Sequence, residues 1–433
     1  MKVSFTSLGC AKNLIDSEQM IALLTAAGHE IVSDPAQADV AVVNTCAFIE
    51  ASQAEAIDTI LELADFKKTG RLKKLIVTGC LAQRFQDEIL DQLPEIDAVL
   101  GTSSFPDIVE ALETDEKHFA RFADKSDPLP DLDRVVTTGP GWAYVKIADG
   151  CDNRCAYCVI PSIRGRFRSR PVDAILSESR ALVKAGVKEL ILVAQDVTRY
   201  GHDLKDGTTL CMLLRELVKL EGVEWIRLHY LYPDEITDEL VDLIAKEPKI
   251  VHYLDIPIQH VNDSILHRMR RRETKQSIET LFASLRARIP DCALRTSLIV
   301  GLPGEGEAEF SELMDFLREQ KLPRAGVFTY SPEEGTAAAT MTDRCTAEEA
   351  EVRREAVMAL QARIMDDYDA CQVGKIIRVL CQSGGDGRLV GRSFADSPDI
   401  DEAVSFTGHG VPGEFSRVKI TDFEDGCLRG EAL

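Results

Sequence analysis

The sequence predicts an α/β protein in three parts: an N-terminal parallel α/β sheet, a central βα barrel or partial barrel, and a small all-β barrel at the C-terminus. Short, almost continuously apolar segments alternate with helical periodicity up to about residue 369. Such alternation is typical of parallel strands whose two faces are covered by helices. Beyond residue 370, short strand-like segments are separated by Gly, Pro and Asp turns, which indicates a compact β module.

The first part, residues 1–113, contains three apolar strands with the sequences VSFTSL, DVAVVNT and KLIVTG. After the first strand, Asp16 and Gln19 predict a capping pair for a helix over 17–27, which Gly28 ends. A second helix is predicted after the second strand. Its apolar positions are Ile57, Ile60, Leu61 and Ala64.

A cysteine follows each of these strands: Cys10, Cys46 and Cys80. In open α/β sheets, ligands bind outside the carboxyl ends of the strands. Three thiols that are distant in sequence are therefore expected to share one site. The alternative is that they are small buried apolar side chains, the common environment of free cysteine.

Residues 114–136 are polar, contain two prolines and show no clean period, so we expect a linker. A second alternation follows over 137–369, with helices expected at 173–185 and 234–246. Its six strands have the sequences AYVKIAD, ELILVAQD, WIRLHYLYP, YLDIPIQ, ALRTSLIVGLPG and AGVFTYSP. Six βα units indicate a barrel or partial barrel with its chemistry at the carboxyl ends of the strands.

Thr346 and Glu349 predict a capping box for a long helix that extends to about residue 369. Its expected apolar stripe is Val352, Ala356, Leu360 and Ile364. The last part, residues 370–433, contains three predicted strands, KIIRVLC, GRLVGRS and SRVKITD.

The most informative segment is DGCDNRCAYCVIPSIRGRFRSR, which begins at residue 149 and holds Cys151, Cys155 and Cys158 in a CxxxCxxC spacing. Thiolates are soft ligands that suit an iron–sulfur cluster or zinc. A structural zinc site normally has four ligands, and this loop contains no fourth Cys or His. A cubane held by three thiolates keeps one iron open for a small ligand, and a zinc loop remains the alternative.

The chain carries 50 basic and 72 acidic residues, a net charge of −22. This balance argues against broad nucleic-acid binding and favours a basic partner. No apolar segment approaches the ~20 residues that span a bilayer, and the N-terminus lacks a signal-peptide core. We therefore expect a cytoplasmic protein, in which twelve cysteines indicate reduced thiols and metal ligation.

The CxxxCxxC spacing resembles the signature of the radical S-adenosylmethionine (SAM) enzymes. The whole chain resembles the radical-SAM methylthiotransferases of the RimO type, and its last part resembles a TRAM domain. The segments that carry the likeness are SLGCAKNLIDSE, VNTCAFI, VTGCLAQR, GCDNRCAYCVIPSIRG, YLDIPIQH and GRSFADSPDID. One departure is Ala11, where many relatives carry proline; it is not a ligand position.

The resemblance implies two 4Fe–4S clusters, one on Cys151, Cys155 and Cys158 and one on the three strand-end cysteines. The first would pass an electron, from a donor of the flavodoxin or ferredoxin type, into SAM and release a 5′-deoxyadenosyl radical. The second would supply or carry sulfur, and a second SAM would give the methyl group. The implied substrate is an aspartate β-carbon of protein twelve of the small ribosomal subunit.

Further residues are candidate contacts for SAM or the clusters. Arginine forms bidentate bonds to carboxylates, and the two arginines chosen match family positions. The others lie in the cysteine loop or near expected strand ends, although a tight turn or a satisfied core residue is an alternative for most of them. The candidates are Tyr157, Arg164, Arg170, Gln195, Asp255, Gln259, Gly301, Gly304 and Glu305.

Two other functions remain open: a tRNA-adenosine methylthiotransferase of the MiaB kind, and a two-cluster electron carrier or sensor without SAM turnover. Six βα units argue against the carrier, which needs no substrate-sized barrel. From Asp369 to Leu433 there are eleven acidic and seven basic residues, a net charge of −4. An acidic module favours a basic ribosomal protein over tRNA, unless it packs only against its own barrel domain.

Overall fold

The computed structural model describes residues 1–86, 88–385, 387–424 and 426–433. Contacts between residues divide the chain into two compact units. The first consists of Met1–Thr137, Lys146–Ala174 and Glu333–Thr336, and the second of Thr138–Val145, Ile175–Pro332 and Ala337–Leu433. The CxxxCxxC segment thus belongs to the same unit as the N-terminal sheet. The domain boundaries expected from the sequence stay a prediction.

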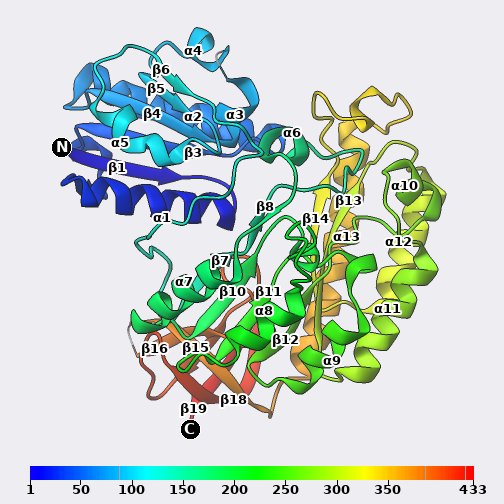
Figure 1. The fold of residues 1–433 in the computed structure, drawn as a ribbon. Coiled ribbons are helices and arrows are strands. Elements are labelled where there is room, and N and C mark those ends of the chain that lie inside the picture. Colours follow the sequence, from blue (N-terminus) through cyan, green and yellow to red (C-terminus); the bar gives the residue numbers. More distant parts are fainter. Residues whose placement is uncertain (87, 386, 425) are drawn as a thin grey trace. The chain divides into compact units, whose positions relative to one another are not determined.

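The first unit contains a six-stranded, fully parallel sheet in the order β2-β1-β3-β4-β5-β6 (Figure 1). The strands are β1 (Lys2–Ser7), β2 (Glu30–Val32), β3 (Val40–Thr45), β4 (Lys74–Gly79), β5 (Ala98–Leu100) and β6 (Phe119–Arg121). The helices are α1 (Ala11–Ala26), α2 (Glu50–Thr69), α3 (Cys80–Phe85), α4 (Glu88–Gln92) and α5 (Ile108–Glu113). The predicted parallel α/β sheet is confirmed.

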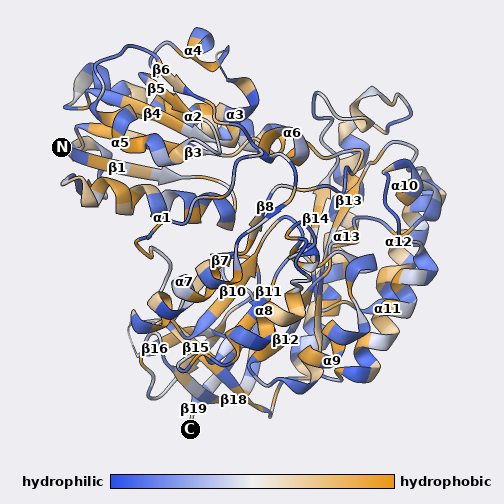
Figure 2. Cartoon of the chain, in the orientation of Figure 1, coloured by the Kyte–Doolittle hydropathy of each residue, from blue (hydrophilic) through white to orange (hydrophobic). Residues whose placement is uncertain are grey.

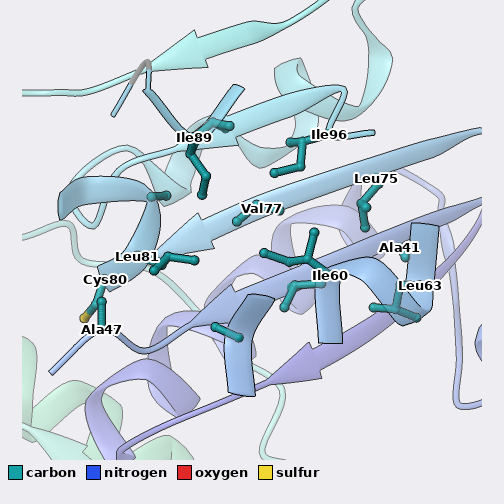
Figure 3. Packing of buried hydrophobic residues seen from close by; sticks show 14 of the residues in the cluster. Ala41, Ala47, Ile60, Leu63, Leu75, Val77, Cys80, Leu81, Ile89 and Ile96 are labelled. Atoms are coloured by element: carbon teal, nitrogen blue, oxygen red, sulfur yellow. The ribbon is translucent and has the colours of Figure 1, made fainter. Parts of the chain in front are cut away.

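Both faces of this sheet are buried, which explains the continuously apolar strands. Along β3, Val40 and Val42 belong to a core with α1 and α5, while Ala41 and Val43 belong to a core with α2 and α3. Figure 2 shows how hydrophobic the central strands are. Figure 3 shows the second core, with Cys80 beyond the arrowhead of β4 at one end of the packed side chains.

Several local predictions for this unit are wrong. The first helix begins at Ala11, not at residue 17, and its N-cap is Cys10, so Asp16 and Gln19 form no capping pair. The side chain of Asp16 is instead engaged by basic residues from elsewhere in the chain. The end is confirmed, because Gly28 adopts φ +86° two residues after α1.

The predicted apolar face of α2 is only half right. Ile60 and Ala64 are buried, whereas Ile57 and Leu61 are 38% and 41% exposed. The buried face is completed by Ala56 and Leu63. Three short strands, β2, β5 and β6, were not predicted, and β6 lies within the expected linker, where it pairs with β5.

The second unit holds a six-stranded sheet in the order β14-β13-β12-β11-β10-β7, with parallel pairing from β10 to β14. The strands are β7 (Trp142–Lys146), β10 (Glu189–Val193), β11 (Trp225–Leu228), β12 (Ile250–Asp255), β13 (Ala293–Val300) and β14 (Arg324–Thr329). The helices between them are α7 (Val172–Lys184), α8 (Leu210–Leu217), α9 (Asp238–Lys246), α10 (Asp263–Arg268), α11 (Lys275–Arg288) and α12 (Glu307–Gln320). The six predicted βα units are confirmed as a parallel sheet.

Helix α13 (Ala347–Ala370) begins with the predicted capping box, in which Thr346 and Glu349 exchange side-chain to backbone hydrogen bonds. Its predicted stripe is only partly right, since Ile364 is buried but Val352 is 64% exposed. The buried face lies mostly at neighbouring positions, Ala350, Val357, Gln361 and Ile364. Among the helices of the described residues, none is both long and apolar enough to cross a bilayer.

The C-terminal module is a closed barrel in the order β15-β16-β17-β19-β18, as predicted for its class. Its strands are β15 (Ile376–Gly385), β16 (Arg388–Arg392), β17 (Val404–Thr407), β18 (Phe415–Glu424) and β19 (Cys427–Ala432). Val379, Val404, Phe406, Val418 and Ile420 form its core. The sequence did not predict β17 and β19.

Arg324, at the start of β14, is buried among three carboxyl groups. Its Nη2 lies 2.8 Å from Asp396, 3.2 Å from Glu402 and 3.9 Å from Asp369. One guanidinium cannot compensate three buried negative charges. Burial, reinforced by the neighbouring carboxyl groups and opposed by Arg324, raises the pKa of Glu402 to about 8. Burial also raises the pKa of Asp369.

This pKa predicts a pH dependence of stability. In the unfolded chain Glu402 titrates near ~4.3, so its raised pKa in the folded state makes stability fall as pH rises through about 8. Glu402→Gln should remove this contribution and flatten the decline in unfolding temperature between about pH 5 and 8. Circular dichroism melts at several pH values test this, with the exposed Glu431→Gln as control. An unchanged slope in Glu402→Gln would contradict the assignment.

Candidate functional site

The three strand-end cysteines of the first unit lie at one edge of the sheet. Strands β1, β3 and β4 are neighbours in the sheet order, and all three run in the same direction. Cys10 is the N-cap of α1, Cys46 directly follows β3, and Cys80 is the first residue of α3. Parallel topology therefore brings together residues that are 70 positions apart along the chain.

Gly9 shows how closely two of these segments approach. It adopts φ +86°, and a Cβ placed on it would lie 2.7 Å from the Cβ of Cys46 and 3.1 Å from its Sγ. A side chain at this position would push Cys46 away from Cys10. The residue before the first cysteine must therefore be glycine for both conformational and steric reasons.

The thiols differ in their ease of ionisation. Burial raises the pKa of Cys46, and it raises that of Cys80 to about 12. Burial also opposes ionisation of Cys10, but the charges of Lys12 and Arg164 and the backbone N–H groups at the start of α1 outweigh it and lower the pKa of Cys10. A thiolate is the metal-binding form of cysteine, so the lowered pKa of Cys10 favours metal binding.

A buried amide fixes the geometry around these cysteines. The Nδ2 of Asn13 donates to the carbonyl oxygens of Leu8 at 3.1 Å and Thr45 at 2.8 Å. Leu8 belongs to the segment that leads to Cys10, and Thr45 directly precedes Cys46. Asn44 in turn donates to the carbonyl oxygen of Asn13 at 2.7 Å. These bonds connect the ends of β1 and β3 to the first turn of α1.

The CxxxCxxC loop is closed by its own backbone. It follows β8 (Ala148–Asp149), which pairs with β9 (Arg168–Ser169), and ends in α6 (Ile160–Arg164). The N–H of Cys151 donates to the carbonyl of Gly165 at 3.1 Å, and that of Cys158 to the carbonyl of Cys155 at 3.1 Å. All three cysteines are half-buried.

Gly150 is required at the base of this loop. It adopts φ +81°, and an added Cβ would lie 2.1 Å from the carbonyl oxygen of Arg166. The far end of the loop is held by packing, because Val159 and Ile163 belong to the same core cluster as Cys80 and Leu81.

Arg164 connects the two cysteine sets within the first unit. Its side chain is 1% exposed, and Nη1 donates to Oδ2 of Asp149 at 2.7 Å. Nη2 donates to Oδ1 of Asn13 and lies 3.4 Å from Oδ2 of Asp16. Lys146 forms a further buried ion pair with Asp16. The charge of Arg164 also lowers the pKa of Cys10, one of the strand-end thiols.

Both cysteine sets fit an iron–sulfur cluster by the chemistry of their donors, because each offers three thiols. Among the described residues, no three His, Cys, Asp or Glu side chains converge as ligands of a single ion. Thiolates that each bind a different iron of a cubane do not have to meet at one point.

The second unit contains the residues expected to contact SAM near the carboxyl ends of its strands. Asp255 ends β12, Gln195 lies two residues beyond β10, and Gln259 follows β12 and bridges to Leu298. Gln259 has φ +67° and Tyr230, after β11, has φ +60°. Positive φ in non-glycine residues is strained and is concentrated at functional sites.

The side chain of Asp255 has fixed partners. Its Oδ1 accepts a bond from Arg295 at 2.7 Å, and its Oδ2 accepts the backbone N–H of Tyr230 at 3.2 Å. The side chain is 1% exposed. Its orientation is therefore set by β13 and by the strained turn after β11.

Gly301, Gly304 and Glu305 form a turn whose polar groups are hydrogen-bonded to other groups of the protein. Gly301 donates its N–H to Oε2 of Glu305 at 3.0 Å, and Oε1 of Glu305 accepts a bond from Arg353 at 2.8 Å. A Cβ on Gly301 would lie 2.8 Å from that of Ala350. Gly304 adopts φ +90°, and a Cβ on it would lie 3.0 Å from Nε of Arg268, so both glycines and Glu305 shape the turn.

Arg170 and Tyr157 are the other two candidate contacts in the first unit. Arg170 donates to the carbonyl of Lys146 at 2.9 Å and to Asp131 at 3.1 Å, so it supports the chain between β7 and β8. Tyr157 is half-buried in the turn between the second and third loop cysteines.

Sequence reasoning missed the polar residues that hold the site together: Asn13, Asp16, Lys146, Asp149, Tyr230 and Arg295. A signal was present for some of them. Lys146 interrupts an apolar strand, and Asp149 directly precedes the cysteine loop. A charge in a strand buried on both faces requires a partner.

Three family models match the chain. Residues 2–101 match the uncharacterized protein family UPF0004, residues 145–317 the radical SAM superfamily, and residues 373–433 the TRAM domain. Among solved structures, the radical SAM methyltransferase TsrM from Kitasatospora setae is 15% identical, with a TM-score of 0.57 over 78% of this chain and 76% of its own. This likeness concerns the fold alone.

Relatives of known name match over the whole length. The ribosomal protein uS12 methylthiotransferase RimO of Trichlorobacter lovleyi is 46% identical, and the match covers 100% of this chain and 98% of that protein. The RimO of Geobacter sulfurreducens is also 46% identical, with the same coverage. The chain therefore belongs to the RimO family of radical SAM methylthiotransferases.

Proposed function

We propose that the chain converts a C–H bond at the β-carbon of an aspartate in ribosomal protein uS12 into C–SCH3. Family membership supports this substrate, since the full-length relatives are named for uS12. The observation that carries the chemistry is the pair of three-cysteine sets in one compact unit, connected by buried Arg164. The acceptor is an unactivated carbon, and no side-chain base is strong enough to remove its hydrogen as a proton.

Each cysteine set would hold one 4Fe–4S cluster. Cys151, Cys155 and Cys158 would bind the cluster that, once reduced, cleaves SAM and yields the hydrogen-abstracting radical. The strand-end set would bind the second, sulfur-supplying cluster. The half-buried CxxxCxxC loop keeps its thiols accessible to a small ligand, whereas Cys46 and Cys80 are buried and shielded from water.

Arg164 would compensate the negative charge that thiolate ligands bring into a buried site. Asp149 and Asp16 hold its guanidinium in place. Lys12 adds a second positive charge beside Cys10.

The SAM contacts of the second unit would lie near the carboxyl ends of its strands. Gln195, Asp255 and Gln259 offer amide and carboxylate groups there, and in the first unit Tyr157 offers an aromatic face. The turn that includes Gly301, Gly304 and Glu305 would be held in shape by its own hydrogen bonds. Arg170 would hold the chain beside the cysteine loop through its bond to the carbonyl of Lys146. The reducing partner would be a flavodoxin or ferredoxin type of donor, and the compartment the cytoplasm.

The net charge of the C-terminal module overstates the charge that it shows to a partner. Four of its eleven acidic residues are largely buried and face arginines of its own unit: Asp369, Asp396, Asp401 and Glu402. Arg392, one of its seven basic residues, is buried against Glu189. Charge alone therefore discriminates less between uS12 and tRNA than the sequence count suggests, and the preference for uS12 rests on the family.

Removing each cysteine set should separate two steps. Alanine at Cys151, Cys155 and Cys158 should remove about four irons per chain and abolish SAM cleavage. Alanine at Cys10, Cys46 and Cys80 should remove a similar amount of iron but leave SAM cleavage measurable, with no methylthio product. The exposed Cys371→Ala is the control. Reductive SAM cleavage that survives the first triple change would refute the assignment.

Loss of Arg164 should destabilise the fold, because the buried carboxylates of Asp16 and Asp149 would then share the charge of Lys146. We expect Arg164→Met to cost ~3–5 kcal/mol of unfolding free energy. Arg166→Met, whose side chain is 82% exposed, should change it by less than ~0.5 kcal/mol. Urea unfolding of the cluster-free chain measures both, and equal effects would mean that the buried ion pairs do not hold the site.

The substrate is tested by direct competition. The holoenzyme is incubated with purified small ribosomal subunits and with isopentenyladenosine-containing tRNA, and mass spectrometry detects the added methylthio group. We expect modification of uS12 and unmodified tRNA. Methylthio-tRNA together with unmodified uS12 would move the assignment to the tRNA-modifying class.

A further inference from the structure

The loop between β16 and β17 belongs to the C-terminal module in sequence, but it is buried against the sheet of the second unit. It carries the segment GRSFADSPDID, which no step of the proposed chemistry uses. Asp396 is 2% exposed and Ser397 is fully buried. Phe394 offers its carbonyl to Arg227 of β11 at 2.8 Å, and the hydroxyl of Ser397 lies 2.9 Å from Nε2 of His229.

Asp401 is the residue through which this loop reaches β12 and β13. Its Oδ2 accepts the hydroxyl of Tyr253 at 2.6 Å and the backbone N–H of Ser397 at 2.8 Å. Its Oδ1 lies 3.6 Å from Nε of Arg295. The side chain of Asp401 is 4% exposed and that of Arg295 is 9% exposed, so water does not replace these contacts.

Arg295 continues the chain of contacts to the strand ends. Its Nη1 donates to Oδ1 of Asp255 at 2.7 Å, while Oδ2 of Asp255 accepts the backbone N–H of Tyr230 in the strained turn after β11. The guanidinium is planar, so a partner on its Nε side restricts the direction of its Nη groups. The orientation of Asp255 therefore depends on the carboxylate of Asp401.

We propose that Asp401 is a positioning residue for the SAM site: through Arg295 it fixes Asp255 and the adjoining turn in the orientation that binds SAM. This inference rests on the proposed SAM contact of Asp255. It gives the C-terminal module a role at the SAM site, because its loop holds the side chains at the carboxyl end of β12 in place. Catalytic contacts require side chains held within a narrow geometry by such surrounding residues.

Asp401→Asn tests this in the reconstituted holoenzyme. Asparagine keeps the shape and still accepts the bond from Tyr253, but it removes the charge that faces Arg295. We expect the KM for SAM to rise about tenfold, the scale of coupling within one hydrogen-bonded network, with a smaller change in kcat for SAM cleavage. Asp399→Asn is the matched control, because it removes the same charge from an exposed position of the same loop and should leave KM unchanged.

A double-mutant cycle distinguishes positioning from packing. If Asp401 acts through Arg295, then Asp401→Asn combined with Arg295→Gln should bind SAM no more weakly than Arg295→Gln alone. Multiplying effects would show that the two residues act independently and would overturn the proposal. Tyr253→Phe removes a bond to Asp401 without breaking the Asp401–Arg295 pair, so it should lower the unfolding temperature with little effect on KM. An equal rise of KM in Tyr253→Phe would mean that lost stability is the cause.

Asp255→Asn, measured in parallel, separates this proposal from the proposed function. A raised KM in Asp255→Asn with an unchanged KM in Asp401→Asn would overturn the positioning role and leave the SAM contact intact. An unchanged KM in Asp255→Asn would remove the SAM contact of Asp255, and the positioning role with it. Neither outcome affects the assignment of the cysteine sets, which the triple alanine variants test.

Discussion

The first unit depends on one buried positive charge. Arg164 lies at the end of the CxxxCxxC loop, yet its partners, Asn13 and Asp16, belong to the first helix of the N-terminal sheet. A buried guanidinium is strongly unfavourable without compensating groups. Separation of the loop from the sheet would therefore leave Arg164 without its partners in the first helix. Asp149 and Lys146 complete a set of two acidic and two basic side chains that is neutral as a whole. The same charge that fixes the loop also favours the thiolate of Cys10, which couples the fold of this unit to its capacity to bind metal.

Buried arginines also hold the second unit together, where they join the C-terminal module to the parallel sheet. Arg227, Arg295 and Arg324 lie on three strands of the sheet, and each contacts the loop that joins β16 and β17. Arg227 donates to a backbone carbonyl, whereas Arg295 and Arg324 form ion pairs with carboxylates of the loop. Such ion pairs contribute little net stability compared with apolar packing, but they penalise every arrangement that leaves one partner alone. They therefore favour one packing arrangement of the C-terminal barrel against the parallel sheet. Substitution within the loop is expected to affect the carboxyl ends of β11 and β12, although the loop itself belongs to another module of the sequence.

Much of this architecture could be predicted from the sequence, because it follows from local periodicity and parallel topology. The three strand-end cysteines, the CxxxCxxC loop and the capping box at Thr346 needed only short-range patterns. The failures have a common cause. Asp16 was interpreted as a helix cap from its neighbours in sequence, whereas its side chain is taken by Lys146 and Arg164, more than a hundred residues away. Short edge strands such as β2 and β6 carry too few apolar residues to give a period, and pairing with a neighbouring strand stabilises them only in the folded sheet.

Charge illustrates the same limit at the level of function. The acidic count of the C-terminal module favours a basic partner only if those carboxylates face solvent. In the folded unit, Asp396 and Asp401 compensate Arg324 and Arg295, and the pKa of Glu402 is raised to about 8, so that this group is largely neutral at physiological pH. These acidic residues face arginines of the sheet that they contact. A surface that recognises uS12 has to be sought among the exposed residues of the module, and the net charge of a sequence segment is a measure of recognition only after its internal ion pairs have been subtracted.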